Sequence, residues 1–302
     1  MSMATRIRDR LCSLIWPGRC KSHFIHRCLL LLALGLLPTG VWAQAPAPVA
    51  PAQRIVSLAP HITELVFAAG AGSRLVGTVQ SSDYPSEISS LPRVGDGLHV
   101  DPETLISLKP DLVLGWQAGA TQAVAPILKT LDIPLIHINP ESVQEIPDAI
   151  EKIGKLTQNS ATASAVAASM RQRLQNLKQL APRKPVSVVL EINATPFYVV
   201  GNDPLLNDAL QYCNANNHFG NAPQAAPLIG LENLLANQPD FIVVRDEPGQ
   251  PMQERIAFLA GKGIKAARQA KVIGIDPDLL FRPGPRLVGA LEQLCAQLEG
   301  KR

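Results

Sequence analysis

The chain has 302 residues, of which 46% are hydrophobic and 18% are charged, so it can form folded cores and is not a mainly disordered chain. Its formal charge of +3 depends on the first 43 residues, which hold six Lys or Arg and one acidic residue; the remainder carries a net charge of −2. Because phosphate contacts need a basic footprint, this slightly acidic body argues against nucleic acid as the main partner.

The first 43 residues have the pattern of a secretory signal peptide. Basic residues precede an apolar run of ten residues, Cys28–Leu37, whereas a helix that spans a bilayer core needs about 20. The segment closes on Val41-Trp42-Ala43, which is typical of a cleavage site. We therefore expect a signal peptide over residues 1–43, cleaved after about Ala43, with a membrane anchor or a buried helix as the alternatives. An Ala- and Pro-rich tether, residues 44–53, follows it.

Export leaves two cysteines in the body of the protein, because Cys12, Cys20 and Cys28 are removed with the leader. Cys213 and Cys295 form an even pair in an oxidising compartment, which favours a disulfide bond between them. Two buried free thiols are the alternative.

Short strand-like runs alternate with helical patterns from residue 54 onward. In chain order the first half predicts a strand over 54–58, a helix over 62–69, a strand over 75–78, a helix over 102–108, a strand over 111–115, a helix over 122–130 and a strand over 135–138. This alternation predicts parallel βαβ units with helices on both faces of the sheet. Ligands of such sheets lie beyond the carboxyl ends of the strands.

A long helix is predicted between the two halves. Ser160–Leu180 contains many helix formers with apolar residues at spacings of three and four, and Pro182 and Pro185 follow it. At about 1.5 Å per residue this segment would span about 30 Å, the width of a small lobe. One stiff helix should therefore join the lobes, and their closure around a ligand should be small.

The second half repeats the pattern of the first. It predicts strands over 186–192, 241–244 and 272–275, and helices over 205–212, 231–236, 252–260 and 285–298. Glu103 precedes Pro110 by seven residues, as Glu232 precedes Pro239, and both pairs stand before a strand. The predicted fold is therefore α/β: two β/α lobes with mainly parallel sheets, residues 54–157 and 183–302, joined by a single long helix within 158–182.

Several short blocks carry a resemblance to a known family. They are Arg54–Pro60 with Thr63-Glu64, Ser82–Pro85, Glu103 with Leu108–Val113, Trp116, Pro196-Phe197, Glu232 with Pro239, Arg282 with Pro285-Arg286, and Cys295. In these blocks the body of the chain resembles the periplasmic solute-binding proteins with a helical backbone, and within them most closely the receptors for cobalamin. The resemblance implies a monomeric periplasmic protein that binds a metal chelate and delivers it to the permease dimer of an ABC importer in the inner membrane.

The resemblance also implies a ligand site between the lobes. Tyr84, Trp116 and Phe197 suit it, because aromatic side chains bury a large apolar area against a flat macrocycle. Asp278 and Arg282, which follow the last predicted strand, are implied to contact the polar amide rim of cobalamin. A surface ion pair is the alternative interpretation of these two residues.

Two features of the sequence leave the ligand open. Ser81 and Ala226 stand where the cobalamin receptors have aromatic residues, so haem or a ferric siderophore is the alternative cargo. His61 follows the first strand, and its imidazole could ligate cobalt or iron, although a lone histidine at a helix start is more often a hydrogen-bonding group. The other histidines of the body lack the spacing of a metal site, so we expect no resident metal or cofactor.

Glu103 and Glu232 occupy equivalent positions in the two halves. The resemblance implies that these two carboxylates dock on basic pockets of the permease, while acids at a helix start also interact favourably with the helix dipole. The sequence contains no Gly-x-Ser-x-Gly elbow, His-Glu-x-x-His motif or phosphate-binding Gly-x-x-x-x-Gly-Lys loop. We therefore expect a receptor and not an enzyme, with an exported metalloenzyme as the less favoured alternative.

Overall fold

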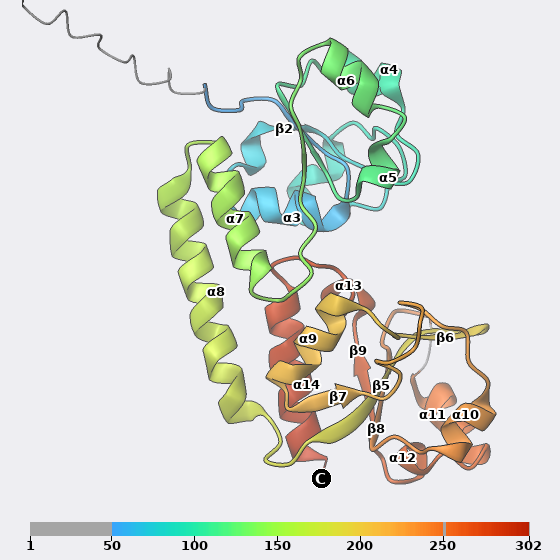
Figure 1. The fold of residues 1–302 in the computed structure, drawn as a ribbon. Helices are drawn as coiled ribbons and strands as arrows, with labels where there is room; N and C mark the ends of the chain where they lie inside the picture. The colour runs from blue at the N-terminus through green and yellow to red at the C-terminus, as the bar shows by residue number, and fades with distance from the viewer. Residues whose placement is uncertain (1–49, 250–251, 302) are drawn as a thin grey trace, which may run out of the picture. The chain divides into compact units, whose positions relative to one another are not determined.

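Two sheets, one from each half of the chain, organise the fold (Figure 1). The structure, a computed structural model, describes residues 50–249 and 252–301. The predicted signal peptide lies outside these residues, as does most of the predicted tether. None of the described helices combines the length and the apolar character that crossing a bilayer requires.

The N-terminal lobe is built on four parallel strands in the order β2-β1-β3-β4. The strands are β1 (Ile55–Ser57), β2 (Leu75–Gly77), β3 (Leu112–Gly115) and β4 (Leu135–His137). The helices are α3 (Pro60–Ala68), α4 (Pro102–Ser107), α5 (Ala118–Thr121), α6 (Ala125–Thr130) and α7 (Glu145–Leu156), with short 3₁₀ turns η2 (Gly72–Arg74) and η3 (Ser86–Ser90).

The C-terminal lobe has five strands, of which four follow the order β6-β5-β8-β9 while β7 pairs with the start of β5. All pairs are parallel except β5 with β6. The strands are β5 (Val186–Ala194), β6 (Phe197–Val199), β7 (Ala215–Asn217), β8 (Phe241–Arg245) and β9 (Val272–Ile275). The helices are α9 (Pro204–Tyr212), α10 (Leu231–Ala236), α11 (Met252–Gly261), α12 (Lys265–Arg268), α13 (Pro277–Leu280) and α14 (Leu287–Gly300). The predicted fold class is thus confirmed.

The aspartate that follows the proline of each internal repeat, Asp111 or Asp240, has the same structural role in both lobes. The Asp111 carboxylate accepts hydrogen bonds from the backbone N–H groups of Gln53 and Arg54, at 2.8 and 2.9 Å, where the chain enters β1. In the second lobe the Asp240 carboxylate accepts from the N–H of Ser187 in β5, at 2.8 Å. Each Asp thus ties the strand that follows it to the first strand of its own sheet.

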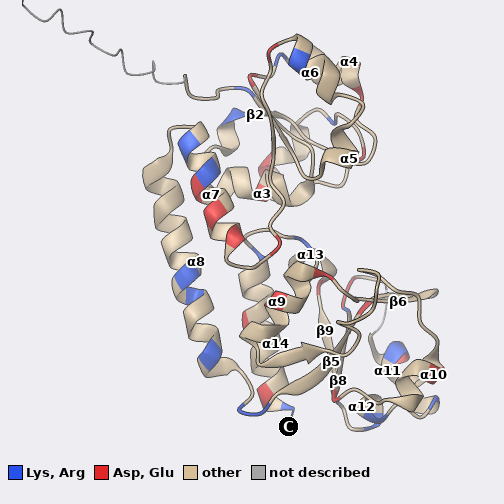
Figure 2. Cartoon of the chain, in the orientation of Figure 1, with Lys and Arg blue, Asp and Glu red and all other residues tan. Residues whose placement is uncertain are grey.

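Helix α8 (Ser160–Leu180) has the bounds that the sequence predicted. Its buried side chains, which include Ala163 and Met170, pack against α7 of the N-terminal lobe and α14 of the C-terminal lobe. Figure 2 shows acidic residues on α7 and basic residues on α8, and Arg171 pairs there with Asp148 and Glu151 at 2.6 and 2.9 Å. Helix α8 therefore packs against both lobes.

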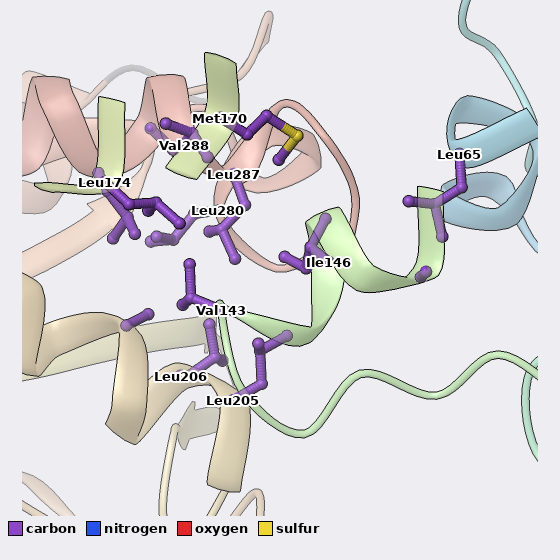
Figure 3. Close-up of a cluster of buried hydrophobic side chains, with 14 of the residues drawn as sticks. Leu65, Val143, Ile146, Met170, Leu174, Leu205, Leu206, Leu280, Leu287 and Val288 are labelled. Carbon is purple, nitrogen blue, oxygen red and sulfur yellow. The ribbon is translucent and has the colours of Figure 1, made fainter. Parts of the chain in front are cut away.

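A continuous apolar core joins the lobes in addition to the helix. Figure 3 shows side chains of α3, α7, α8, α9, α13, α14 and the loop before α7 packed in one cluster. Those labelled are Leu65, Val143, Ile146, Met170, Leu174, Leu205, Leu206, Leu280, Leu287 and Val288. All of these side chains are buried. Because protein interiors are close-packed, this shared core resists relative movement of the lobes.

Two parts of the N-terminal lobe differ from the sequence prediction. The helix expected over 122–130 is shortened to α6, and the separate short helix α5 precedes the expected range. Pro126 stands in the first turn of α6, where its missing N–H costs no helical hydrogen bond. Helix α7 was not predicted, although Ile146, Ile150 and Ile153 follow a helical spacing and are fully buried.

The predicted disulfide bond is confirmed. Cys213, at the end of α9, is bonded to Cys295 in α14, and both residues are fully buried. The bond fastens α9 to the helix that lies against α8.

Candidate functional site

The predicted ligand-binding residues of the N-terminal lobe follow the carboxyl ends of its strands. Strand β1 leads into the first turn of α3, which carries His61; the loop after β2 carries Tyr84; and Trp116 comes directly after β3. Because parallel strands end at the same edge of their sheet, these three segments lie together.

A buried network of hydroxyl groups supports this edge. The Thr63 hydroxyl lies 2.6 Å from that of Ser57 and 2.8 Å from that of Thr78, and Thr78 donates to Ser82 at 2.8 Å. All four side chains are buried. A buried polar group is stabilised only when it is hydrogen-bonded, so this network holds the loop after β2 against the start of α3.

A buried ion pair connects the two lobes at this edge. The Arg286 guanidinium, at the start of α14, donates to both Oε atoms of Glu64 in α3, at 2.7 and 2.9 Å. The side chain of Glu64 is only 2% exposed. A Cβ atom at Gly284 would lie 3.3 Å from the Glu64 carboxylate. The C-terminal loop therefore approaches α3 closely, and Gly284 leaves room for that contact.

The same guanidinium also supports one of the predicted aromatic residues. The Arg286 Cζ atom lies 4.4 Å from the ring centroid of Tyr84, a cation–π contact. Tyr84 remains 48% exposed. The Tyr84 ring is therefore in contact with Arg286 and still largely accessible to solvent.

Arg282 lies at the centre of a second ionic cluster. It contacts Asp83 of the N-terminal lobe at 2.5 Å, Asp278 at 2.7 Å and Glu64 at 3.6 Å. The hydrogen bond from Arg282 holds the pKa of Asp83 below its usual range, while burial raises the pKa of Asp278. The structure thus brings the predicted pair Asp278 and Arg282 together and adds Asp83 to it.

His61 is buried next to Trp116. The His61 side chain is 3% exposed, and its ring lies 5.4 Å from the Trp116 ring with the planes at 81°. Burial lowers the pKa of His61 to about 4, so the imidazole is neutral; the positive charge of Arg282 also lowers it. The imidazole hydrogen-bonds the backbone carbonyl of Ile138, while Nε2 is buried without a partner.

Trp116 is the exposed member of this pair. It is 37% exposed, and its indole Nε1 donates a hydrogen bond to Asn139 Oδ1 at 2.7 Å, in the loop after β4. Part of the Trp116 side chain is thus accessible to a ligand, while its indole N–H is held by the loop after β4.

Phe197 lies in strand β6 of the C-terminal lobe and is only 9% exposed. The Arg255 guanidinium covers its ring at 5.0 Å, and the same guanidinium is paired with Glu191 at 2.6 Å. Arg255, Glu191 and Phe258 all line a pocket of about 340 Å³. In this conformation Arg255 separates Phe197 from the surface, so its role as a ligand contact stays a prediction.

A second pocket, of about 550 Å³, has walls from both lobes. It lies among α3, the loop after β2, α8 and the segment from α13 to α14, and its lining includes Tyr84, Arg286 and Phe67. The Arg286–Tyr84 contact therefore forms part of its wall.

The two predicted docking residues are exposed at the starts of short helices. Glu103 lies in α4, whose N-cap Asp101 accepts from the Glu103 N–H at 3.0 Å, and Glu232 lies in the first turn of α10. Helix α4 precedes β3 and α10 precedes β8, and each of these strands pairs with the first strand of its sheet. The two carboxylates thus occupy topologically equivalent positions.

No group of three or more His, Cys, Asp or Glu residues in the described part of the chain is placed to hold a metal ion. Three residues that sequence reasoning did not assign to the site, Glu64, Asp83 and Arg286, complete its ionic clusters. All three stood in the blocks that carried the family resemblance. Nothing in their local sequence indicates that each pairs with a residue of the other lobe.

Comparison with known proteins agrees with this geometry. A family model described as periplasmic binding protein matches residues 55–279. The chain belongs to the periplasmic binding protein family. The predicted family is thereby confirmed, and it is a family of binding proteins.

Individual relatives cover both lobes. The chain is 31% identical over 246 residues to a vitamin B12-binding protein of Photorhabdus laumondii, a match that spans 81% of this chain and 87% of the relative. It is 30% identical over 250 residues to a vitamin B12-binding protein of Vibrio cholerae, with 82% and 90% covered.

Solved structures share the fold. The periplasmic vitamin B12 binding protein of Vibrio cholerae matches with a TM-score of 0.74 at 30% identity, covering 83% of this chain and 98% of that one. A periplasmic heme-binding protein of Roseiflexus matches with a TM-score of 0.72 at 25% identity, covering 82% and 98%. The fold is therefore shared by proteins that bind different chelates.

Proposed function

We propose that this protein captures cobalamin in the periplasm and delivers it to an ABC permease in the inner membrane. The observation that carries the proposal is the group of outward-facing side chains at the carboxyl ends of the strands: the aromatic rings of Trp116 and Tyr84 beside the carboxylates of Asp83 and Asp278. The names of the relatives in Photorhabdus and Vibrio support the choice of ligand.

The chemistry of these side chains suits cobalamin. A corrin ring is flat and largely apolar, and the exposed rings of Trp116 and Tyr84 would bury apolar area against it. Its rim carries amide groups, whose N–H groups can donate hydrogen bonds to the carboxylates of Asp83 and Asp278. In this proposal the buried His61 supports the Trp116 ring, and Phe197 remains a predicted ligand contact next to Arg255.

The alternative cargo is haem or a ferric siderophore. Its support is the structural likeness to the Roseiflexus heme-binding protein and the small residues Ser81 and Ala226, where the sequence resemblance leads one to expect aromatic rings. An exported metalloenzyme is a weaker alternative, because an enzyme needs a nucleophile or base with an orienting partner at the site.

Export and docking complete the proposal. A signal peptide over residues 1–43, removed after about Ala43, would deliver the protein to the periplasm as a monomer. Glu103 on the N-terminal lobe and Glu232 on the C-terminal lobe would each meet a basic pocket of the two-fold permease. Binding and release supply no chemistry of their own, so the importer's ATPase must drive the transport.

Calorimetry of the protein without residues 1–43 tests the proposed ligand. Cyanocobalamin should bind with a dissociation constant in the micromolar range or below, and hemin and a panel of ferric siderophores should bind at least about tenfold more weakly. Tighter binding of hemin or of a siderophore than of cyanocobalamin would show that the proposed ligand is wrong and would identify the tighter-bound compound as the ligand.

A substitution tests whether binding occurs at this site. We expect Trp116→Ala to weaken cyanocobalamin binding about tenfold or more, because the truncated side chain loses a large apolar contact. Leu180→Ala, which truncates another exposed apolar side chain at the end of α8, should leave the affinity unchanged. Equal affinities of the two variants would place the ligand elsewhere.

A further inference from the structure

We propose that Asp83 sets the ligand specificity of this site: by occupying the Arg282 guanidinium, it makes the site select ligands whose rim offers amide N–H groups over ligands that carry carboxylates. The inference rests on the proposed function and adds the residue that discriminates between the two classes of cargo.

The first step is to account for the guanidinium donors. Nη1 of Arg282 donates to Asp83 Oδ1 at 2.5 Å, and Nη2 lies 3.2 Å from Asp83 Oδ2 and 2.7 Å from Asp278 Oδ1. Arginine recognises carboxylates through this planar fork of donors. Asp83 thus occupies the Nη1–Nη2 fork with one bond to each nitrogen, which is the geometry that a carboxylate of the ligand would otherwise take.

The second step is the order of the groups from the inside outward. The side chain of Arg282 is 17% exposed, whereas those of Asp83 and Asp278 are 53% and 43% exposed. A ligand that approaches this surface therefore meets carboxylate oxygens before it meets the guanidinium. Carboxylate oxygens accept hydrogen bonds and do not donate them, so they match an amide N–H.

The third step is the charge of the whole cluster. Three carboxylates, from Glu64, Asp83 and Asp278, surround the two guanidinium groups of Arg282 and Arg286. The cluster thus carries one net negative charge when all five groups are ionised. The hydrogen bond from Arg282 lowers the pKa of Asp83, whereas burial raises the pKa of Asp278. A ligand carboxylate would be repelled here, and repulsive contacts are an effective source of specificity.

The fourth step distinguishes Asp83 from Asp278. Asp83 comes from the N-terminal lobe and contacts both terminal nitrogens of Arg282, while Asp278 contacts Nη2 alone. Removing the charge of Asp83 would leave the 3.6 Å contact to Glu64 as the remaining ionic contact of Nη1. Removing that of Asp278 would leave both contacts to Asp83 in place. Asp83 therefore decides whether the guanidinium is available.

The experiment compares two probes on two proteins. The probes are cyanocobalamin and a derivative in which one rim amide has been hydrolysed to a carboxylate; the proteins are the chain without residues 1–43 and its Asp83→Asn variant. For the unchanged protein we expect the amide form to bind about tenfold or more tightly than the carboxylate form. In Asp83→Asn this ratio should fall about tenfold, because a neutral amide competes with the ligand carboxylate for Arg282 more weakly than a charged carboxylate does, and no longer repels it.

Asp148→Asn is the matched control. It removes an exposed carboxylate that is paired with another arginine, Arg171 on α8, and it changes the net charge equally. This variant should keep the ratio of the unchanged protein, and Asp83→Glu should keep most of it. A measurement on the unchanged protein needs no variant at all: raising the salt from about 0.05 to about 0.5 M should improve the relative binding of the carboxylate form, because salt screens repulsion between exposed charges.

The outcomes separate this inference from the proposed function. If cyanocobalamin binds but the ratio is the same in the unchanged protein and in Asp83→Asn, or if the ratio is near one throughout and independent of salt, the role of Asp83 is overturned while the function stands. If neither probe binds the unchanged protein, the proposed function fails and this inference fails with it.

Discussion

At the scale of single residues, three buried side chains at the proposed ligand site have a defined charge state. Glu64 and Arg286 are buried as a pair that joins the two lobes, and His61 is buried as a neutral imidazole. Ionic groups remain charged at such positions only when they are paired, because burial removes them from water. The stability of the protein should therefore depend on these residues individually.

Loss of one member of the buried pair should be costly. Arg286→Met leaves the Glu64 carboxylate buried without its principal partner, and we expect the free energy of unfolding to fall by about 3–5 kcal/mol. The control is Arg173→Met, which also breaks a two-bond pair with a carboxylate, Glu292, but one with partners 43% and 37% exposed. That variant should lose about 1 kcal/mol or less. Chemical denaturation measures both, and equal losses would contradict the argument.

His61 should make stability depend on pH. Its pKa is lowered from 6.5 to about 4 on folding, so the unfolded chain binds a proton more readily than the folded one. Stability should therefore be lost as the pH falls from about 6.5 to about 4, and the loss should reach about 3 kcal/mol.

The His61→Gln variant isolates this contribution. Its urea unfolding curves, measured at several pH values across that window, should show a weaker pH dependence than those of the unchanged protein. Parallel pH profiles of the two proteins would show that His61 does not titrate as described.

At the scale of elements, the packing of α8 is the main determinant. One face of this helix is buried against α7 and α14, while its other residues are exposed or partly exposed. Isolated helices are marginally stable in water, so tertiary packing of the buried face supplies most of their stability. The disulfide bond between Cys213 and Cys295 links α14, one of the two helices that pack against α8, to α9.

The buried face of α8 can be tested with one substitution made at two places. Leu174→Ala removes a side chain that is 2% exposed in the shared core, and we expect a loss of about 2–5 kcal/mol in the free energy of unfolding. Leu180→Ala removes the same atoms at a position that is 40% exposed, and it should cost less than about 1 kcal/mol. A loss at Leu174 as small as that at Leu180 would mean that the buried face of α8 does not stabilise the shared core.

At the scale of the whole molecule, the two lobes are joined by more than a connecting helix. The shared apolar core, the Glu64–Arg286 pair and the contact of Asp83 with Arg282 all link them near the proposed ligand site. Asp208 of α9 also accepts a hydrogen bond from the Val143 N–H at 2.8 Å. Such a molecule should present its two docking surfaces at a nearly constant separation.

Charge reversal tests the proposed docking of the two lobes. The double variant Glu103→Lys and Glu232→Lys should abolish transport in reconstituted vesicles, because like charges would meet at both basic pockets. Each single reversal should give a partial loss, and Asp148→Lys on α7 should have little effect. The affinity for ligand should stay within about twofold in all four variants, since α4 and α10 carry none of the proposed ligand contacts. Loss of ligand binding in the double variant would show that these glutamates act on the site and not on the permease.

The sequence by itself predicted the β/α alternation of both lobes, the bounds of α8 and the pairing of Cys213 with Cys295. These features depend on hydrophobic spacing, on proline positions and on counting, all of which are local or compositional. Only the tertiary structure decided the ionic site. Glu64 and Arg286 are 222 positions apart, and Asp83 and Arg282 are 199 apart. Their pairing and the burial of His61 and Phe197 depend on how closely the lobes approach. The shared core and the disposition of the loops set that distance, and no short stretch of sequence records it.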